Sequence, residues 1–194
     1  MNCTSLESVK IEGNNVSMGG SQFSGCSNLK HVDFGNGIKN IGDQCFSSCS
    51  SLYDIVYPAS VTTIGSKVLN NITTNRRITL LGLTPPPFGQ NSMGSVGNPE
   101  NGGNIIYVKN AAYADYAVAT GYKNFVTYNQ LRSIAGIEYN ASTYTVQALG
   151  RDNVELYVDS SLIDSSVYTF TPGTEDSSHV VTVKSVDPSL GVLD

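Results

Sequence analysis

Three cysteines recur at one fixed interval, and this period limits the chain to a repeat architecture. Cys3, Cys26 and Cys49 are evenly spaced, with a period of 23 in the residue numbering. Each cysteine opens a stretch with the pattern C-[ST]-x-L-x-x-[VI]-x-[apolar], which occurs three times. A unit of this length buries its apolar side only by stacking on the next unit, so the period predicts a solenoid.

Alternation within each predicted strand separates an inner face from an outer face, because successive side chains of a strand point in opposite directions. The residues expected to face inward are Val9, Ile11, Val32, Phe34, Ile55 and Tyr57. A second recurring feature is a glycine after Met or Ile, at Gly19, Gly42 and Gly65. We expect glycine there because the chain turns with positive φ or with close backbone approach. Val16 comes one residue late in the first repeat, which predicts a local irregularity.

The regular array is predicted to run out in a partial fourth unit. Ile78 and Leu80 keep the spacing of 23 from Ile55 and Tyr57, whereas Asn75 stands where leucine is expected. Residues 84–104 are rich in Pro, Gly, Ser and Asn, which is typical of a turn followed by a surface loop. Residues 111–121 are predicted to form one helix that ends at Gly121.

The repeat unit, including Pro58 and the Ile64-Gly65 pair, resembles the BspA-like leucine-rich repeats of bacterial surface proteins, familiar from Bacteroidales. The resemblance runs from residue 3 to about 131, since Ile106 to Phe125 is similar to the closing segment of such arrays. It implies a repeat scaffold whose ligands differ between proteins. It also implies an extracellular or bacterial cell-surface location, with any signal segment outside this chain.

After residue 133 the pattern changes to short β runs about ten residues apart, which predict a small antiparallel sandwich. The predicted strands cover residues 137–139, 144–146, 154–158, 167–170 and 180–183. We therefore expect a mainly β chain with two domains. Residues 1–132 form a short leucine-rich-repeat solenoid with a helix-containing closing segment, and residues 133–194 form a β-sandwich-like domain, similar to immunoglobulin-like modules in architecture only.

Charge and hydropathy exclude two classes of partner. The net charge is -5, from 11 Lys and Arg against 16 Asp and Glu, so no basic field attracts nucleic acid or an anionic membrane. The sequence has no apolar run long enough to span a bilayer. The partner that the resemblance implies is a protein or glycan ligand at the cell surface.

The cysteine column allows two interpretations. Cysteines on adjacent turns have Cα atoms about 5 Å apart, within disulfide range. However, a column of three cannot pair off internally, and its apolar neighbours favour reduced, buried, structural thiols. A Cys45–Cys49 bond and a zinc site are weaker alternatives, because no histidine or paired CxxC motif accompanies them.

Catalytic motifs are absent from the sequence. The chain has two histidines, His31 and His179, and neither lies in a hydrolase, metalloprotease or nucleotide-binding motif. His31 and Asp54 fall in the same column of the predicted sheet on adjacent coils, but no serine or cysteine nucleophile is predicted beside them. We predict no catalytic residue, no metal ligand and no cofactor.

A binding function is expected on the outer face of the repeat sheet. The candidate ligand-binding residues combine an aromatic ring with several charges, and they are Lys30, His31, Tyr53, Asp54, Arg76 and Arg77. Tyr and Arg are enriched at interface anchors. The alternative is an ordinary solvated sheet face whose neighbouring charges alternate in sign.

These observations favour a non-enzymatic bacterial cell-surface or secreted binding protein, with the repeats mediating adhesion or protein or glycan interaction. Two alternatives stay open. One is a structural fragment or spacer of a larger surface array, and the other is an accessory carbohydrate-active enzyme. A cleft with paired carboxylates would favour the enzyme.

Overall fold

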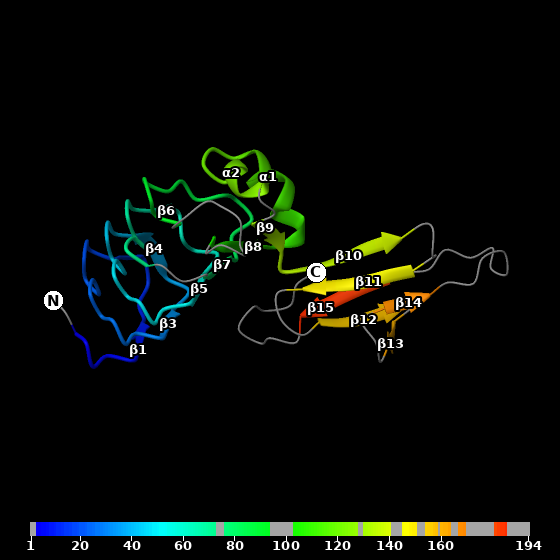
Figure 1. The fold of residues 1–194 in the computed structure, drawn as a ribbon, viewed down its shortest axis with the longest axis horizontal. Coiled ribbons are helices and arrows are strands. Elements are labelled where there is room, and N and C mark those ends of the chain that lie inside the picture. Colours follow the sequence, from blue (N-terminus) through cyan, green and yellow to red (C-terminus); the bar gives the residue numbers. More distant parts are fainter. Residues whose placement is uncertain are drawn as a thin grey trace. The chain divides into compact units, whose positions relative to one another are not determined.

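The structure is a computed structural model that describes residues 3–72, 76–93, 103–127, 130–140, 145–150, 154–158, 160–163, 167–169 and 181–185. The chain divides into two compact units (Figure 1). One unit contains Met1–Val108 and Ala112–Arg132, and the other contains Lys109–Ala111 and Ser133–Asp194. The assignment of residues 1–132 and 133–194 to separate domains stays a prediction.

The first unit is a solenoid with one parallel strand for each coil. Two sheets run along it, β1 beside β3, and β5, β7, β8 and β9 in that order. Their strands are β1 (Ser8–Ile11), β3 (His31–Phe34), β5 (Asp54–Tyr57), β7 (Arg77–Leu80), β8 (Ile105–Val108) and β9 (Leu131–Ser133). Ser8 pairs with His31 and Asp54 pairs with Arg77, so each pairing advances the residue number by 23. The predicted period is therefore the length of one coil.

A third sheet, on another side of the coils, is also parallel and contains β2 (Val16–Ser17), β4 (Ile38–Ile41) and β6 (Thr63–Ile64). Val16 pairs with Ile38, whereas Ser17 pairs with Asn40, so the register shifts between these two residues. The predicted irregularity at Val16 is confirmed. Ile64 also bridges Phe88, which carries this side of the solenoid one coil further.

The recurring glycines allow successive coils to approach closely. A Cβ on Gly42 would lie 2.5 Å from the carbonyl carbon of Gly19, and a Cβ on Gly65 would lie 2.6 Å from the backbone nitrogen of Asp43. Of the two expected reasons, close approach is therefore the one that applies at Gly42 and Gly65.

Left-handed backbone recurs instead at a neighbouring turn, on residues that are not glycine. Ser21, Gln44 and Lys67 have φ of 55°, 55° and 57°, and their numbers again differ by 23 from one coil to the next. Each occupies the same turn in its coil. The sequence carried no signal for this turn, because none of the three residues is of a type that favours a positive φ.

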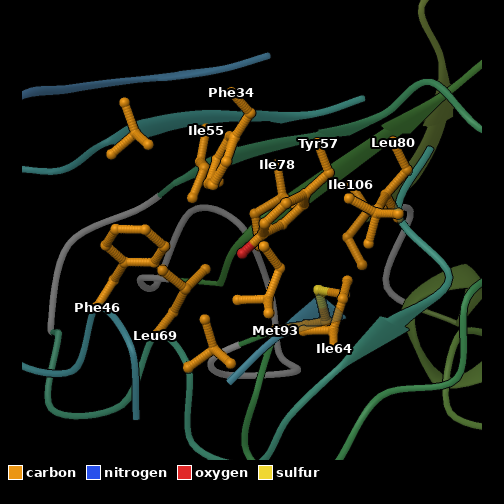
Figure 2. Close-up of a cluster of buried hydrophobic side chains, with 14 of the residues drawn as sticks. Phe34, Phe46, Ile55, Tyr57, Ile64, Leu69, Ile78, Leu80, Met93 and Ile106 are labelled. Atoms are coloured by element: carbon orange, nitrogen blue, oxygen red, sulfur yellow. The ribbon is translucent and has the colours of Figure 1, made fainter. Parts of the chain in front are cut away.

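The core lies between the two rows of strands and repeats from coil to coil (Figure 2). Leu29 and Leu52 are fully buried, and each such side chain contributes about 1.5–3 kcal/mol through the hydrophobic effect. Phe34 contacts Tyr57 with 5.6 Å between ring centroids, and Phe23 stacks on Phe46 at 5.6 Å. The inward alternation is confirmed, with Val32, Phe34, Ile55 and Tyr57 buried and Val9 and Ile11 half-buried in the first coil.

The array continues beyond the predicted partial fourth unit, to about five turns. β8 pairs in parallel with β7, and Ile106 and Val108 are buried like Ile78 and Leu80. Arg77 pairs with Ile105, so this coil is longer than the repeat period. The longer step explains why a period of 23 did not reveal this coil. Asn75 and part of the predicted loop lie outside the described residues.

Two short helices replace the single helix predicted for residues 111–121. They are α1 (Tyr113–Val118) and α2 (Lys123–Val126), preceded by the 3-10 turn η2 (Asn110–Ala112). α1 ends because Ala119 adopts extended backbone, and Gly121 then has φ of 89°.

Buried tyrosines tie these helices to the solenoid. The hydroxyl of Tyr116 donates to the carbonyl of Gly82 at 3.2 Å, and the hydroxyl of Tyr122 donates to that of Pro86 at 2.8 Å. The ring of Tyr122 also packs edge-on against Phe88, with 4.7 Å between centroids. The helices therefore cover apolar side chains of the last coils.

In the second unit, the described strands pair antiparallel in two three-stranded sheets. The first sheet has the order β10 (Ala135–Asn140), β11 (Thr145–Gly150) and β14 (Val167–Thr169). The second has the order β13 (Ser161–Ile163), β12 (Val154–Val158) and β15 (Val181–Ser185). Sequence reasoning missed β13, and the immunoglobulin-like architecture of this unit stays a prediction.

Candidate functional site

The outer face comprises the solvent-facing residues on or just before β1, β3, β5 and β7. Lys30 and His31 are exposed there, and the Tyr53 side chain is 56% exposed. Asp54 and Arg77 are partly exposed. The structure therefore brings five of the six predicted residues to one face.

Ion pairs join neighbouring coils across this face. Nζ of Lys30 lies 3.1 Å from Oε2 of Glu7, and Nη2 of Arg77 donates to Oδ2 of Asp54 at 2.7 Å. The first pair is open to water, whereas the second is partly shielded, with side chains 35% and 23% exposed. Water and salt screen the attraction between Arg77 and Asp54 less than that between Lys30 and Glu7. The guanidinium of Arg77 is therefore held in one orientation more firmly than the ammonium of Lys30.

Lys10 forms an ion pair with a residue of its own coil, two positions later in the sequence. Its Nζ lies 2.7 Å from Oε1 of Glu12. The hydrogen bond and charge of Glu12 raise the pKa of Lys10, and the charge of Asp33 on the next coil raises it further. The edge of the outer face thus carries a local pair rather than a pair between coils.

The prediction that Arg76 lies on the outer face is wrong. Its side chain is 1% exposed, and Nε donates to the carbonyl of Leu52 in the preceding coil. Its backbone nitrogen donates to Oδ1 of Asn104 at 3.0 Å. Burial lowers the pKa of the guanidinium to about 10. The side chain turns inward where the regular repeat ends, and its Nε there donates to the buried carbonyl of Leu52.

The thiols are free, as the structural interpretation of the cysteines predicted. Cys26, Cys45 and Cys49 are fully buried, and burial raises the pKa of all three, to about 12 for Cys45 and about 11 for Cys49. Cys3 is exposed, so the expectation of burial is wrong for this member of the column.

The outer face presents an exposed aromatic ring and charged side chains paired between coils. Asp54, the carboxylate expected near His31, is engaged by Arg77. Within the described ranges, no group of three or more His, Cys, Asp or Glu residues is placed to hold a metal ion. His179 lies outside the described residues.

Exposed apolar side chains that sequence reasoning missed lie away from the outer face, and the two most exposed among the described residues are Leu83 and Val118. Leu83, after β7, is 58% exposed, and Val118, at the end of α1, is 78% exposed. Neither stands out in the sequence, because single exposed apolar residues are common at protein surfaces.

In the part of the chain that the structure describes, no helix combines the length and apolar character needed to cross a bilayer.

A family model described as a BspA type leucine rich repeat region, in six copies, matches residues 1–84. No curated protein matches the chain. Members of this family are generally surface adhesion or binding proteins, typically of bacteria, and the repeat is a non-enzymatic scaffold. The matched period and the stacked parallel coils agree, so residues 1–84 are similar to the BspA-type leucine-rich repeat in both sequence and fold.

Proposed function

We propose that this chain is a non-enzymatic binding protein of the bacterial cell surface or extracellular space, and that its outer face recognises a protein partner. The family supports this role, because its members are generally surface adhesion or binding proteins. The observation that carries the proposal is Tyr53, whose aromatic side chain is 56% exposed on a strand face of mostly polar residues.

The surroundings of Tyr53 suit an interface anchor. A tyrosine presents a large ring at low conformational cost, and Tyr and Arg dominate measured hot spots. Arg77, held by Asp54 in the preceding coil, offers a guanidinium whose orientation is set before binding. Lys30 and His31 supply further donors from the coil before Tyr53. The combination fits a partner surface with an apolar recess and nearby carboxylate or carbonyl groups.

The binding residues proposed for this site are Lys30, His31, Tyr53, Asp54 and Arg77. A glycan ligand is the alternative, since a tyrosine ring also stacks on sugars. The spacer and accessory-enzyme alternatives predict no dependence of binding on these five residues.

The test is a binding screen with the full chain. Immobilised extracellular-matrix proteins and a glycan array serve as probes, and the Tyr53→Ala and Arg77→Ala variants are compared with the wild type. We expect binding to at least one protein, weakened about tenfold or more by Tyr53→Ala, which corresponds to about 1.4 kcal/mol. Leu83→Ala is the matched control, because it removes an equally exposed apolar side chain outside the strands.

Protein binding that neither variant alters would overturn the site. Binding to glycans alone would replace the proposed protein partner with the glycan alternative. Loss of binding in Leu83→Ala as well would point to a different surface.

A further inference from the structure

Cys3 and Cys26 occupy the same position in successive coils. Each accepts, through its carbonyl, a hydrogen bond from the leucine three residues later: Leu6 at 3.1 Å and Leu29 at 3.0 Å. The side chain of Asn28 ties the two turns together by donating to the carbonyl of Thr4 at 2.7 Å. Neighbouring coils are about 4.8 Å apart, and disulfides join Cα atoms about 4.4–6.8 Å apart.

The two thiols differ in their access to solvent. Cys3 is exposed, whereas Cys26 is fully buried. Burial raises the pKa of the Cys26 thiol, and Cys3 is a neighbouring residue that also acts on this pKa. A reagent from solvent therefore meets Cys3 first and finds Cys26 directly behind it.

The remaining two thiols are engaged deeper in the core. Cys49 donates from Sγ to the carbonyl of Phe23 at 3.0 Å, and Cys45 is fully buried beside Phe46 in the sequence. Burial raises the pKa of both thiols, which keeps them protonated and unreactive. The column is thus open to oxidation at one end.

We propose that Cys3 and Cys26 form a redox pair, which hydrogen peroxide converts into a disulfide joining the first two coils. The sulfur of Cys3 attacks one peroxide oxygen, the O–O bond breaks, and Cys3 becomes a sulfenic acid while water leaves. The sulfur of Cys26 then attacks the sulfur of Cys3, and the S–O bond breaks. The departing hydroxide leaves as water with the thiol proton of Cys26, and the two thiols have given two electrons to the peroxide.

The bond joins a coil with half-buried inward side chains to one whose equivalent side chains are buried. Val9 and Ile11 in the first coil are half-buried, whereas their equivalents Val32 and Phe34 in the second coil are buried. A cross-link between residues 3 and 26 reduces the conformational freedom of the first coil when that coil is unfolded. It therefore favours the state in which the first coil packs against the second. Oxidation therefore secures the first coil to the rest of the repeat.

The test uses the full chain, reduced first and then treated with hydrogen peroxide. Free thiols are counted in denaturant, and trypsin releases Cys3 and Cys26 on separate peptides, because it cleaves after Lys10 and Lys30. We expect the thiol count to fall from all four cysteines to two, with the two peptides joined and a combined mass lower by two hydrogen atoms.

Variants separate the two steps. Cys26→Ser removes the second thiol, so Cys3 should accumulate as a sulfenic acid that dimedone labels. Cys3→Ser changes an exposed side chain with little effect on folding, and it should keep its three thiols under the same treatment. Cys45→Ser is the matched control, because it removes a buried thiol outside the pair and should still give the joined peptides.

Three results would overturn the proposal. They are dimedone labelling of Cys3 in the wild type without joined peptides, a bond between Cys45 and Cys49, and cross-linking of two chains through Cys3.

Discussion

Arg77 and Asp54 face each other in strand register on adjacent coils, with 2.7 Å between Nη2 and Oδ2. Their side chains are less exposed than those of Lys30 and Glu7, which form another ion pair between coils on this face. Partial burial reduces screening by water and salt, so the two pairs are expected to differ in strength.

A double-mutant cycle measures this difference. For Asp54→Ala and Arg77→Ala we expect a coupling of about 0.5–1 kcal/mol in the free energy of unfolding, decreasing with added salt. For Glu7→Ala and Lys30→Ala we expect about 0.2–0.5 kcal/mol. Urea unfolding at low and high salt gives both values. Equal coupling energies would show that burial does not distinguish the pairs.

Gly42→Ala tests the close approach of the coils. The added Cβ would lie 2.5 Å from the Gly19 backbone, so we expect a loss of about 1–3 kcal/mol in the free energy of unfolding. Gly19→Ala is the control, because its Cβ would meet only the Gln22 side chain, at 3.4 Å. It should be neutral or stabilise by up to about 1 kcal/mol. Similar losses in both variants, measured by urea unfolding, would contradict the stacking argument.

Asn104→Ala tests a buried link between the later coils. The Asn104 side chain accepts from the backbone nitrogen of Arg76 at 3.0 Å and donates to the carbonyl of Met93 at 2.8 Å. Its removal leaves two buried backbone groups without this partner, so we expect a loss of about 2–4 kcal/mol. Asn28→Ala removes an exposed contact between coils and should cost about 0.5–1 kcal/mol. Thermal and urea unfolding compare the two variants, and equal effects would rule out a special role for Asn104.

Alkaline pH is expected to destabilise the protein through its buried thiols. Burial raises the pKa of Cys45 from 9.0 to about 12, so this thiol ionises in the unfolded chain before it ionises in the folded one. The folded state then holds more protons, and the free energy of unfolding falls as pH rises from about 9 to about 12, by at most about 1.4 kcal/mol per pH unit for this thiol.

The measurement is urea unfolding with a reductant between about pH 8 and about pH 11. In Cys45→Ala this thiol no longer contributes to the pH dependence of the free energy of unfolding. The difference in that free energy between wild type and variant should therefore become smaller as pH rises. Ser47→Ala, at a buried residue that does not titrate, should keep a constant gap. A constant gap for Cys45→Ala would refute the role of the thiol.

Much of the repeat unit could be predicted because its contacts are local and recur. Each coil meets the next through the same positions, so a spacing of 23 in the sequence is also a neighbour relation in space. The strand register, the inward side chains and the close approach at Gly42 and Gly65 all depend on this relation. The position of five of the six candidate binding residues on the outer face depends on the same relation.

The coil length, the inward or outward face of each strand and the resemblance to BspA-like repeats could all be read from the residue pattern. Other features became visible only in the folded chain, namely the inward turn of Arg76, the later coil at β8, the division of the closing segment into α1 and α2, and the exposure of Cys3. These features depend on contacts outside the period, such as Arg76 with Asn104 and Tyr122 with Pro86. A repeat pattern specifies contacts between equivalent positions, whereas the ends of an array are set by whatever distant side chains cover them.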